Sequence, residues 1–305
     1  GGVHLLNAIS DRQGQVTLNS GATTAVLIED DGKSVVLDSQ RDALIKSSAE
    51  QDVLRAASSA GTFDNLSRLQ DRRDQSRVEI VSGGDINFKD GSLTLATGGQ
   101  VVSDAARRSY VGNAAQVDVS GAVGVRVAME RNNVQVKVQG NELRDSPDNR
   151  DNGALISSEV WIDRRELQHV AAGTGGYAAD RWYAGGGLLE VGGYLDNQGH
   201  SIGEWAAQGG TVQLGGSEVV THGGSKINLA GGSLDVQSGV IKQSWLRGTD
   251  GQLYRLDDAP AEMQYAGLYK GFEVDHQRWG VNEAFRNPLV APGERVDNGY
   301  TVGRD

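Results

Sequence analysis

The sequence predicts an all-β protein built as a parallel β-helix, a solenoid in which short strands stack coil upon coil. Between residues 209 and 240 the chain reads GGTVQLGGSEVVTHGGSKINLAGGSLDVQSGV, so four short apolar-alternating runs are separated by Gly, Ser and Asn. Alternation over a few residues is typical of a strand with one buried face, and the separating residues turn easily because they tolerate positive φ. The chain has 43 glycines and only 4 prolines. Strands this short bury a core only when they stack on others.

The spacing within this segment predicts how it coils. Val212 and Leu234 are 22 residues apart, about one circuit of three short strands and three bends. We therefore expect these two residues to occupy successive coils, with Gln213 facing Asp235.

The first part of the chain combines strands with a different kind of segment. Alternating apolar residues predict strands at 16–18, 25–28 and 35–37. Residues 40–77 are instead rich in Ala, Leu, Gln, Arg and Asp, and Ser39 with Asp42 resembles a capping box. We predict a helical insertion over 40–77, formed by two helices that break at Gly61.

Strand patterns then resume and continue to residue 138. The predicted strands are 78–81, 85–88, 92–95, 100–102, 116–119, 123–127 and 134–138, with a short basic break at Arg107-Arg108. The valines at 134, 136 and 138 alternate most cleanly, which predicts one apolar face and one solvated face.

Two further segments interrupt the regular pattern. Residues 143–205 predict an irregular insertion rich in aromatic residues and Gly, with a loop at 143–151 and a short helix at 159–170. Residues 245–280 predict an aromatic-containing excursion. Because a solenoid grows by adding coils, we expect residues 1–305 to form one elongated domain that carries these insertions.

Charge and composition exclude several classes of function. The net charge is −11, from 29 basic and 40 acidic residues, and the basic residues are scattered, so nucleic acid is not an expected partner. The absence of Cys excludes disulfides and thiolate metal sites. No run of 18 apolar residues occurs, so we expect no stable membrane insertion, and the first residues lack the pattern of a signal peptide. We expect the chain to be an internal fragment of a longer protein.

Short motifs point to no catalytic, metal or cofactor site. Residues 148–159 partly match a calcium loop, but Arg150 places a cation at a ligand position, which favours a solvated loop. Residues 173–178 match GxGxxA without the βαβ unit that a dinucleotide site needs, which favours a glycine-rich turn. The patterns GxxxxGK[ST], GxSxG and HExxH are absent.

Aromatic side chains in the irregular segment are the candidate binding residues. Rings stack on sugars and anchor protein interfaces, although the same rings can also pack the insertion's own core. The candidates are Trp161, Trp182, Tyr183 and Trp205, in a cluster with Tyr177 and Tyr194.

Several strings resemble the filamentous-haemagglutinin-like large exoproteins of Gram-negative bacteria. They are residues 192–205, 209–239, 245–248 and 265–273. The resemblance implies a right-handed parallel β-helix, part of the shaft of a protein carried outside the cell by two-partner secretion. It also implies an outer-membrane transporter as partner, which recognises a region outside this chain. No catalytic residue comes with the resemblance.

We therefore expect a non-catalytic structural and binding segment of a secreted or cell-surface adhesin of a Gram-negative bacterium. Its partner would be a host or bacterial surface protein or a glycan. One alternative is a β-helix polysaccharide lyase or glycosidase, which would need two carboxylates in a groove on one face. Another is the stalk of a contact-dependent growth inhibition toxin.

Overall fold

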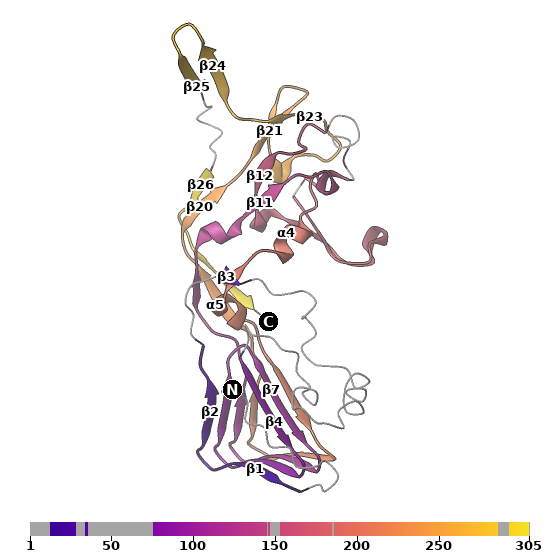
Figure 1. Cartoon of the computed structure of the whole chain (residues 1–305), viewed down its shortest axis with the longest axis vertical. Coiled ribbons are helices and arrows are strands. Elements are labelled where there is room, and N and C mark those ends of the chain that lie inside the picture. The colour runs from indigo at the N-terminus through magenta and orange to yellow at the C-terminus, as the bar shows by residue number, and fades with distance from the viewer. Residues whose placement is uncertain are drawn as a thin grey trace. The chain divides into compact units, whose positions relative to one another are not determined.

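The computed structural model describes residues 13–28, 34–35, 76–144, 146, 153–184, 186–285 and 293–304. These residues are mostly strand, so the predicted all-β class is confirmed (Figure 1). Helical segments among them are short: α4 (Gly192–Asp196), α5 (Ile202–Ala206), η3 (Met129–Asn132), η4 (Asn141–Leu143), η5 (Arg164–Glu166), η6 (Thr174–Gly176) and η7 (Leu256–Asp258). The predicted helical insertion at 40–77 lies outside the described residues, except for its last two positions.

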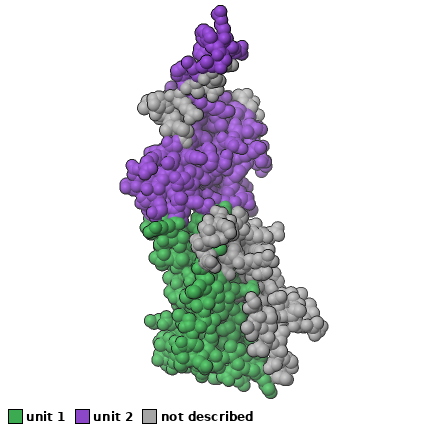
Figure 2. Space-filling model, turned by 60° about the vertical axis from the view of Figure 1, so that its left-hand side comes forward, with its two compact units in different colours: residues 1–126, 199–235, 301–305 green, residues 127–198, 236–300 purple. Residues whose placement is uncertain are grey.

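The chain divides into two compact units, which Figure 2 shows in different colours. Unit 1 consists of residues 1–126, 199–235 and 301–305, and unit 2 of residues 127–198 and 236–300. The chain therefore leaves unit 1 and returns to it twice.

Three parallel sheets form most of unit 1. Each sheet takes its strands from distant parts of the chain, in the orders β1-β5-β8-β17, β2-β6-β9-β18 and β4-β7-β16. The strands are β1 (Gln15–Leu18), β2 (Thr23–Val26), β4 (Arg77–Ser82), β5 (Asp85–Phe88), β6 (Leu93–Ala96), β7 (Gln100–Ala105), β8 (Arg108–Val111), β9 (Gln116–Asp118), β16 (Thr211–Gly215), β17 (Glu218–Thr221) and β18 (Lys226–Asn228). The predicted strands in these regions are confirmed, and β8 is a strand that the sequence analysis missed.

The register of these sheets advances in regular steps. Asp85 on β5 pairs with Arg108 on β8, so the chain returns to the same sheet after 23 residues. The pairs β4 with β7 and β6 with β9 keep the same step. The next strands come much later, since Arg108 pairs with Glu218 on β17, 110 residues further on. Three consecutive strands therefore add one strand to each sheet, and a long segment separates two of these additions.

This register corrects the predicted coiling of residues 209–240. Val212 pairs with Val101, not with Leu234, and Gln213 pairs with Val102. Leu234 belongs to β19 (Gly232–Val236), which lies in another sheet between β10 (Val125–Val127) and β27 (Tyr300–Arg304). The strands were predicted correctly and their partners were wrong, because a regular spacing in sequence does not determine which earlier strand offers a matching edge.

Alternate side chains of the parallel strands form the core of unit 1. Each fully buried Val or Phe side chain contributes roughly 1.5–3 kcal/mol to the free energy of folding. On β6 the polar pattern is inverted, since Thr94 and Ala96 are buried while Leu93 and Leu95 lie half-buried on the opposite face. The core residues are Val78, Ile86, Phe88, Ala96, Val101, Ala105, Val111, Ala115, Val117 and Val119.

Glycine permits close approach where the chain enters a new strand. The Gly210 N–H donates to the carbonyl of Val119, and Thr211 N–H donates to the carbonyl of Gly99, both at 2.9 Å. A Cβ atom on Gly210 would lie 2.2 Å from the Gly99 carbonyl oxygen. A larger residue at 210 would therefore push the two backbones apart.

The remaining elements of unit 1 are short. The strand β3 (Ser34–Val35) pairs antiparallel with β15 (His200–Ser201). The helix α5 follows directly and begins with a capping box, in which Ser201 and Glu204 each satisfy the other's backbone N–H.

Unit 2 is built from antiparallel pairs. They are β11 (Asn133–Lys137) with β12 (Glu159–Asp163), β13 (Gln168–Val170) with β14 (Arg181–Tyr183), β20 (Gly239–Lys242) with β26 (Gly293–Val296), β21 (Trp245–Gly248) with β22 (Leu253–Arg255) and β23 (Tyr265–Leu268), and β24 (Phe272–His276) with β25 (Val281–Phe285). Val134, Val136 and Val138 are buried as predicted. Their core also contains Leu143, Leu155, Val160, Ile162, Ala184, Leu188, Leu189, Val191, Leu246, Leu256, Ala259 and Tyr265.

The predicted helix at 159–170 is wrong. Residues 159–163 form β12, in which Val160 and Ile162 are fully buried against the valines of β11, and residues 168–170 form β13. Alternation decides in favour of a strand here because β11 offers an antiparallel partner. Only the three residues of η5 between the two strands are helical.

Candidate binding site

A glycine-rich hairpin in unit 2 carries two of the four aromatic candidates. Its strands β13 and β14 pair antiparallel, with His169 opposite Trp182 and Val170 opposite Arg181. The loop between them contains η6 and lies away from the other strands of unit 2 in Figure 1. Gly173, Gly175 and Gly176 in this loop have positive φ, a conformation that L side chains rarely adopt. We call residues 168–183 the aromatic hairpin.

One face of the aromatic hairpin packs on the core of unit 2. Trp182 is half-buried against that core, and the imidazole of His169 lies 4.6 Å from its ring, centroid to centroid. His169 Nε2 is 3.2 Å from Asp180 Oδ2, and the other carboxylate oxygen accepts the Ala172 N–H at 2.8 Å. The Ala172 hydrogen bond and the His169 contact lower the pKa of Asp180. Trp182 therefore anchors the hairpin.

The opposite face presents two tyrosines and an arginine. Arg181 and Tyr183 flank Trp182 in β14, so their side chains point to the other side of the strand. The guanidinium carbon of Arg181 lies 5.0 Å from the ring centroid of Tyr177. The Tyr183 hydroxyl donates to the Tyr177 hydroxyl at 3.2 Å. We call Tyr177, Arg181 and Tyr183 the tyrosine-arginine cluster.

Glu190 borders the tyrosine-arginine cluster and fixes the next piece of chain. Its Oε1 accepts the N–H of Gly192 at 3.0 Å and that of Trp182 at 3.4 Å. Its Oε2 lies 3.8 Å from Nη1 of Arg181, which is longer than a hydrogen bond. The carboxylate thus serves the backbone first and leaves the guanidinium able to turn toward a ligand.

The structure places the other two candidates elsewhere. Trp161 lies on β12, with the ammonium of Lys242 4.4 Å from its ring centroid. Trp205 lies in α5 of unit 1, where it makes an edge contact with His200 at 4.8 Å. The four candidates therefore do not form one site. Arg181 was missed by the sequence analysis, although its position beside Trp182 and Tyr183 and after a glycine-rich loop was a usable signal.

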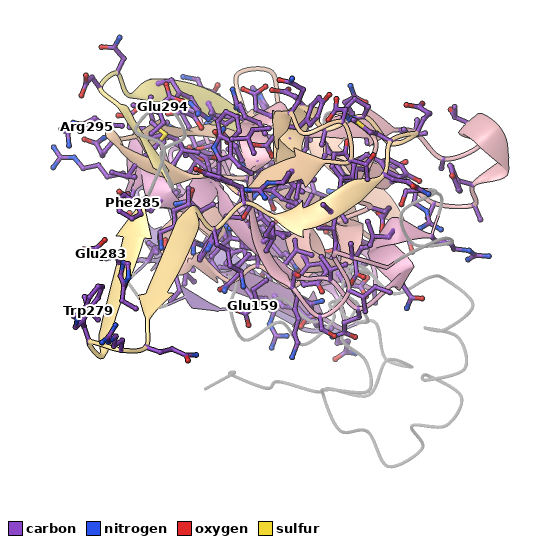
Figure 3. The ribbon with its side chains drawn as sticks, turned by 90° about the horizontal axis from the view of Figure 1, so that it is seen from above. Glu159, Trp279, Glu283, Phe285, Glu294 and Arg295 are labelled. Atoms are coloured by element: carbon purple, nitrogen blue, oxygen red, sulfur yellow. The ribbon has the colours of Figure 1, made fainter. Side chains whose placement is uncertain are left out.

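A second exposed aromatic surface lies on the β24–β25 hairpin. Trp279 in its turn is 70% exposed and Phe285 is 55% exposed, and Figure 3 shows both with Glu283 along this hairpin. His276 stacks near Trp279 at 5.5 Å and lies 3.6 Å from Glu283. This surface is apolar and acidic.

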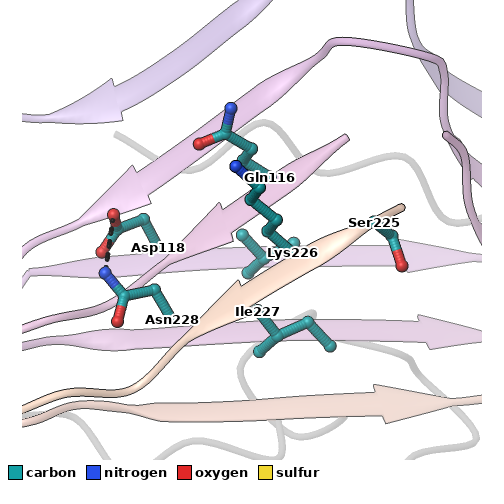
Figure 4. A pocket seen from close by; sticks show the side chains of 7 residues that line it. Gln116, Asp118, Ser225, Lys226, Ile227 and Asn228 are labelled. Atoms are coloured by element: carbon teal, nitrogen blue, oxygen red, sulfur yellow. Dashed lines mark hydrogen bonds between the residues drawn. The ribbon is translucent and has the colours of Figure 1, made fainter. Parts of the chain in front are cut away.

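Unit 1 has a polar hollow over β9 and β18, with a volume of about 440 Å³ (Figure 4). The amide of Asn228 donates to Asp118 at 3.2 Å, and Ser120 donates to the other carboxylate oxygen. Burial alone would raise the pKa of Asp118, but these hydrogen bonds outweigh it and hold the pKa below its ordinary value. The lining residues are Gln116, Val117, Asp118, Ser225, Lys226, Ile227 and Asn228. They offer hydrogen bonds but no ring for stacking.

Asp163 and Asp257 form the carboxyl pair that comes nearest to a catalytic dyad. The Asp163 N–H donates to Asp257 Oδ1 at 3.2 Å. The Asp163 carboxylate is held by Arg165, whose Nη2 is 2.6 Å away. Both aspartates have no exposed surface, so a polysaccharide cannot reach them in this structure.

The described residues contain no group of three or more His, Asp or Glu side chains placed to hold a metal ion. Among them, no helix is long and apolar enough to cross a membrane. Comparison of the chain with protein-family models, curated proteins and solved structures found no match. The function is therefore argued from the geometry of the two units.

Proposed function

We propose that this chain is a non-catalytic structural and binding segment of a secreted or cell-surface exoprotein of the filamentous-haemagglutinin type. In this proposal unit 1 is a right-handed parallel β-helix that acts as a scaffold. The chain carries its binding residues on segments inserted between the strands of that scaffold. The partner is a surface protein or glycan of a host or bacterial cell.

The stepwise register of unit 1 is the observation that carries the proposal. Steps of 23 residues add one strand to each of three parallel sheets, as a stacking solenoid requires. The later step of 110 residues shows that a long segment can leave these sheets without disturbing their register. That segment contains the aromatic hairpin. In repeat proteins, insertions between repeats commonly form the binding face.

Charge and burial support the remaining parts of the proposal. The net charge of −11 disfavours nucleic acid as a partner. The carboxyl pair of Asp163 and Asp257 is closed to solvent, which favours a binding role over hydrolysis or elimination on a polysaccharide. Export by an outer-membrane transporter of a Gram-negative bacterium, through a region outside this chain, completes the proposal, and stable membrane insertion is no part of it.

Cell binding tests the proposal directly. The fluorescently labelled chain is incubated with fixed epithelial cells and with Gram-negative bacteria, and binding is measured by flow cytometry. In one variant an Asn-Gly turn replaces residues 171–180 and closes the pair Val170 and Arg181, which suits a two-residue hairpin loop. In the matched control a different four-residue turn replaces residues 277–280.

We expect saturable binding by the intact chain and by the control, and at least a tenfold loss for the variant without its loop. All three proteins should have the same melting temperature. Absence of saturable binding to any of these cells would refute the binding role. Equal binding by the shortened variant would refute the role of the aromatic hairpin.

A further inference from the structure

We propose that the tyrosine-arginine cluster binds a single carboxylated sugar, whose carboxylate pairs with Arg181 while its ring stacks on Tyr177 or Tyr183. This inference deepens the proposed binding function, since it assigns a ligand class to the same hairpin.

The guanidinium of Arg181 is suited to a carboxylate. Its side chain is 42% exposed, so a ligand can reach it from solvent. The ring of Tyr177 lies 5.0 Å below the guanidinium carbon, and this stacking holds the planar group in one orientation. A carboxylate can then accept two parallel N–H bonds from the guanidinium, a geometry that a lysine cannot offer.

The two tyrosines supply the contacts that distinguish a sugar from a bare anion. Both rings are half-buried, so each keeps part of its surface for stacking against the C–H groups of a pyranose. The hydrogen bond between their hydroxyls at 3.2 Å fixes the rings relative to each other. Each hydroxyl still has acceptor capacity for a sugar hydroxyl.

The loop prepares the cluster before a ligand arrives. Gly173 N–H donates to the Tyr177 carbonyl at 2.7 Å and closes the loop on itself. Gly173 and Gly176 adopt φ of +85° and +84°, which lets the chain turn back sharply just before Tyr177. A cluster held in this way loses little conformational freedom on binding.

Charge limits the ligand to a single acidic sugar. Asp180 and Glu190 flank the one cation of the cluster, and the chain carries a net charge of −11. A polymer with repeated carboxylates or sulfates would be repelled by these groups. One carboxylate at the end of a glycan needs only the one guanidinium.

Ligand titrations followed by saturation-transfer NMR test the inference on the intact chain. The probes are methyl β-D-glucuronide, the methyl glycoside of N-acetylneuraminic acid, methyl β-D-glucoside and sodium acetate. The two acidic sugars represent the two common sources of a sugar carboxylate. At least one of them should bind with a Kd on the order of 1 mM, as suits a ligand of this size. The glucoside and acetate should each bind at least tenfold more weakly.

Variants locate the site. Arg181→Gln and Arg181→Lys should each weaken binding of the acidic sugar at least tenfold, with unchanged far-ultraviolet circular dichroism. Arg247→Gln is the matched control, because Arg247 is exposed and lies 5.9 Å from the ring of Tyr269. It should bind like the original chain.

The inference is overturned if neither acidic sugar binds more tightly than the glucoside, or if acetate binds as tightly as they do. It is also overturned if Arg181→Lys keeps full affinity or if Arg247→Gln loses as much as Arg181→Gln. Cell binding that the acidic sugars do not inhibit would leave the proposed function intact and remove this ligand class. Sugar binding without any cell binding would do the reverse.

Discussion

Replacement of Asp257 by Asn should change how the stability of unit 2 depends on pH. Asp257 is fully buried in η7. Its Oδ1 accepts the Asp163 N–H, while its Oδ2 has no hydrogen-bond partner in the described part of the chain and lies 4.0 Å from Arg255 Nη2. Burial is the main cause that raises the pKa of Asp257 from 3.8 to about 7, and the nearby carboxylates of Asp163 and Asp258 add to the rise.

The sign and size of the effect follow from this pKa. Between about pH 4 and pH 7 the folded chain keeps a proton on Asp257 that the unfolded chain has released. The free energy of unfolding therefore falls as pH rises through this window. A difference of about 3 pKa units, at about 1.4 kcal/mol each, corresponds to about 4 kcal/mol. An asparagine carries no charge at any pH, so Asp257→Asn should remove this loss.

Urea unfolding followed by tryptophan fluorescence measures the effect. Of the five tryptophans, four lie in unit 2, so a Trp205→Phe background leaves only reporters from unit 2. From pH 4 to pH 8, the free energy of unfolding of Asp257→Asn should rise by about 4 kcal/mol relative to the parent. The control is Asp258→Asn, whose carboxyl is 62% exposed. A difference that stays within about 1 kcal/mol over this range would refute the reasoning.

Three further predictions concern local stability, each measured by urea unfolding. Phe88→Ala should cost about 3–5 kcal/mol, because the ring is fully buried in unit 1, and half-buried Leu95→Ala should cost clearly less. Gly173→Ala should cost about 1 kcal/mol, because φ is +85° there. Gly193→Ala, which has no positive φ and open space around its Cα, should be neutral or stabilising. Ser201→Ala should cost about 1 kcal/mol by removing the cap of α5. Equal costs within either compared pair, or no cost at Ser201, would contradict these assignments.

Strands whose alternation was clear in the sequence were predictable, and strands with polar inward residues were not. The valines of β11 announced their face, and the structure buries them. The strand β8 begins with Arg108 and turns Ser109 inward, where its hydroxyl lies 3.0 Å from that of Ser103. Because two serines satisfy each other across neighbouring strands, no apolar pattern marks β8. Only the paired structure shows why Ser109 is buried.

The candidate site was predictable in kind but not in composition. The clustering of aromatic residues with Gly in the irregular segment indicated a surface feature, and Trp182 and Tyr183 do lie on one hairpin. Their adjacency in sequence places them on opposite faces, so Trp182 packs inward while Tyr183 joins Tyr177 and Arg181. Which face meets the core depends on Leu189, Val191 and other residues that only folding brings near.

The sequence by itself determined where strands and turns form, because side-chain alternation and the freedom of glycine act within a few residues. It also determined the acidic charge and the absence of thiol chemistry. The tertiary structure alone decided which strands pair, as in β16, which lies beside β7 and not beside its sequence neighbour β19. Pairing depends on open backbone edges and on the fit of inward side chains from distant segments, and neither is visible in local sequence. The same long-range choice assembled Tyr177, Arg181 and Tyr183 into a cluster.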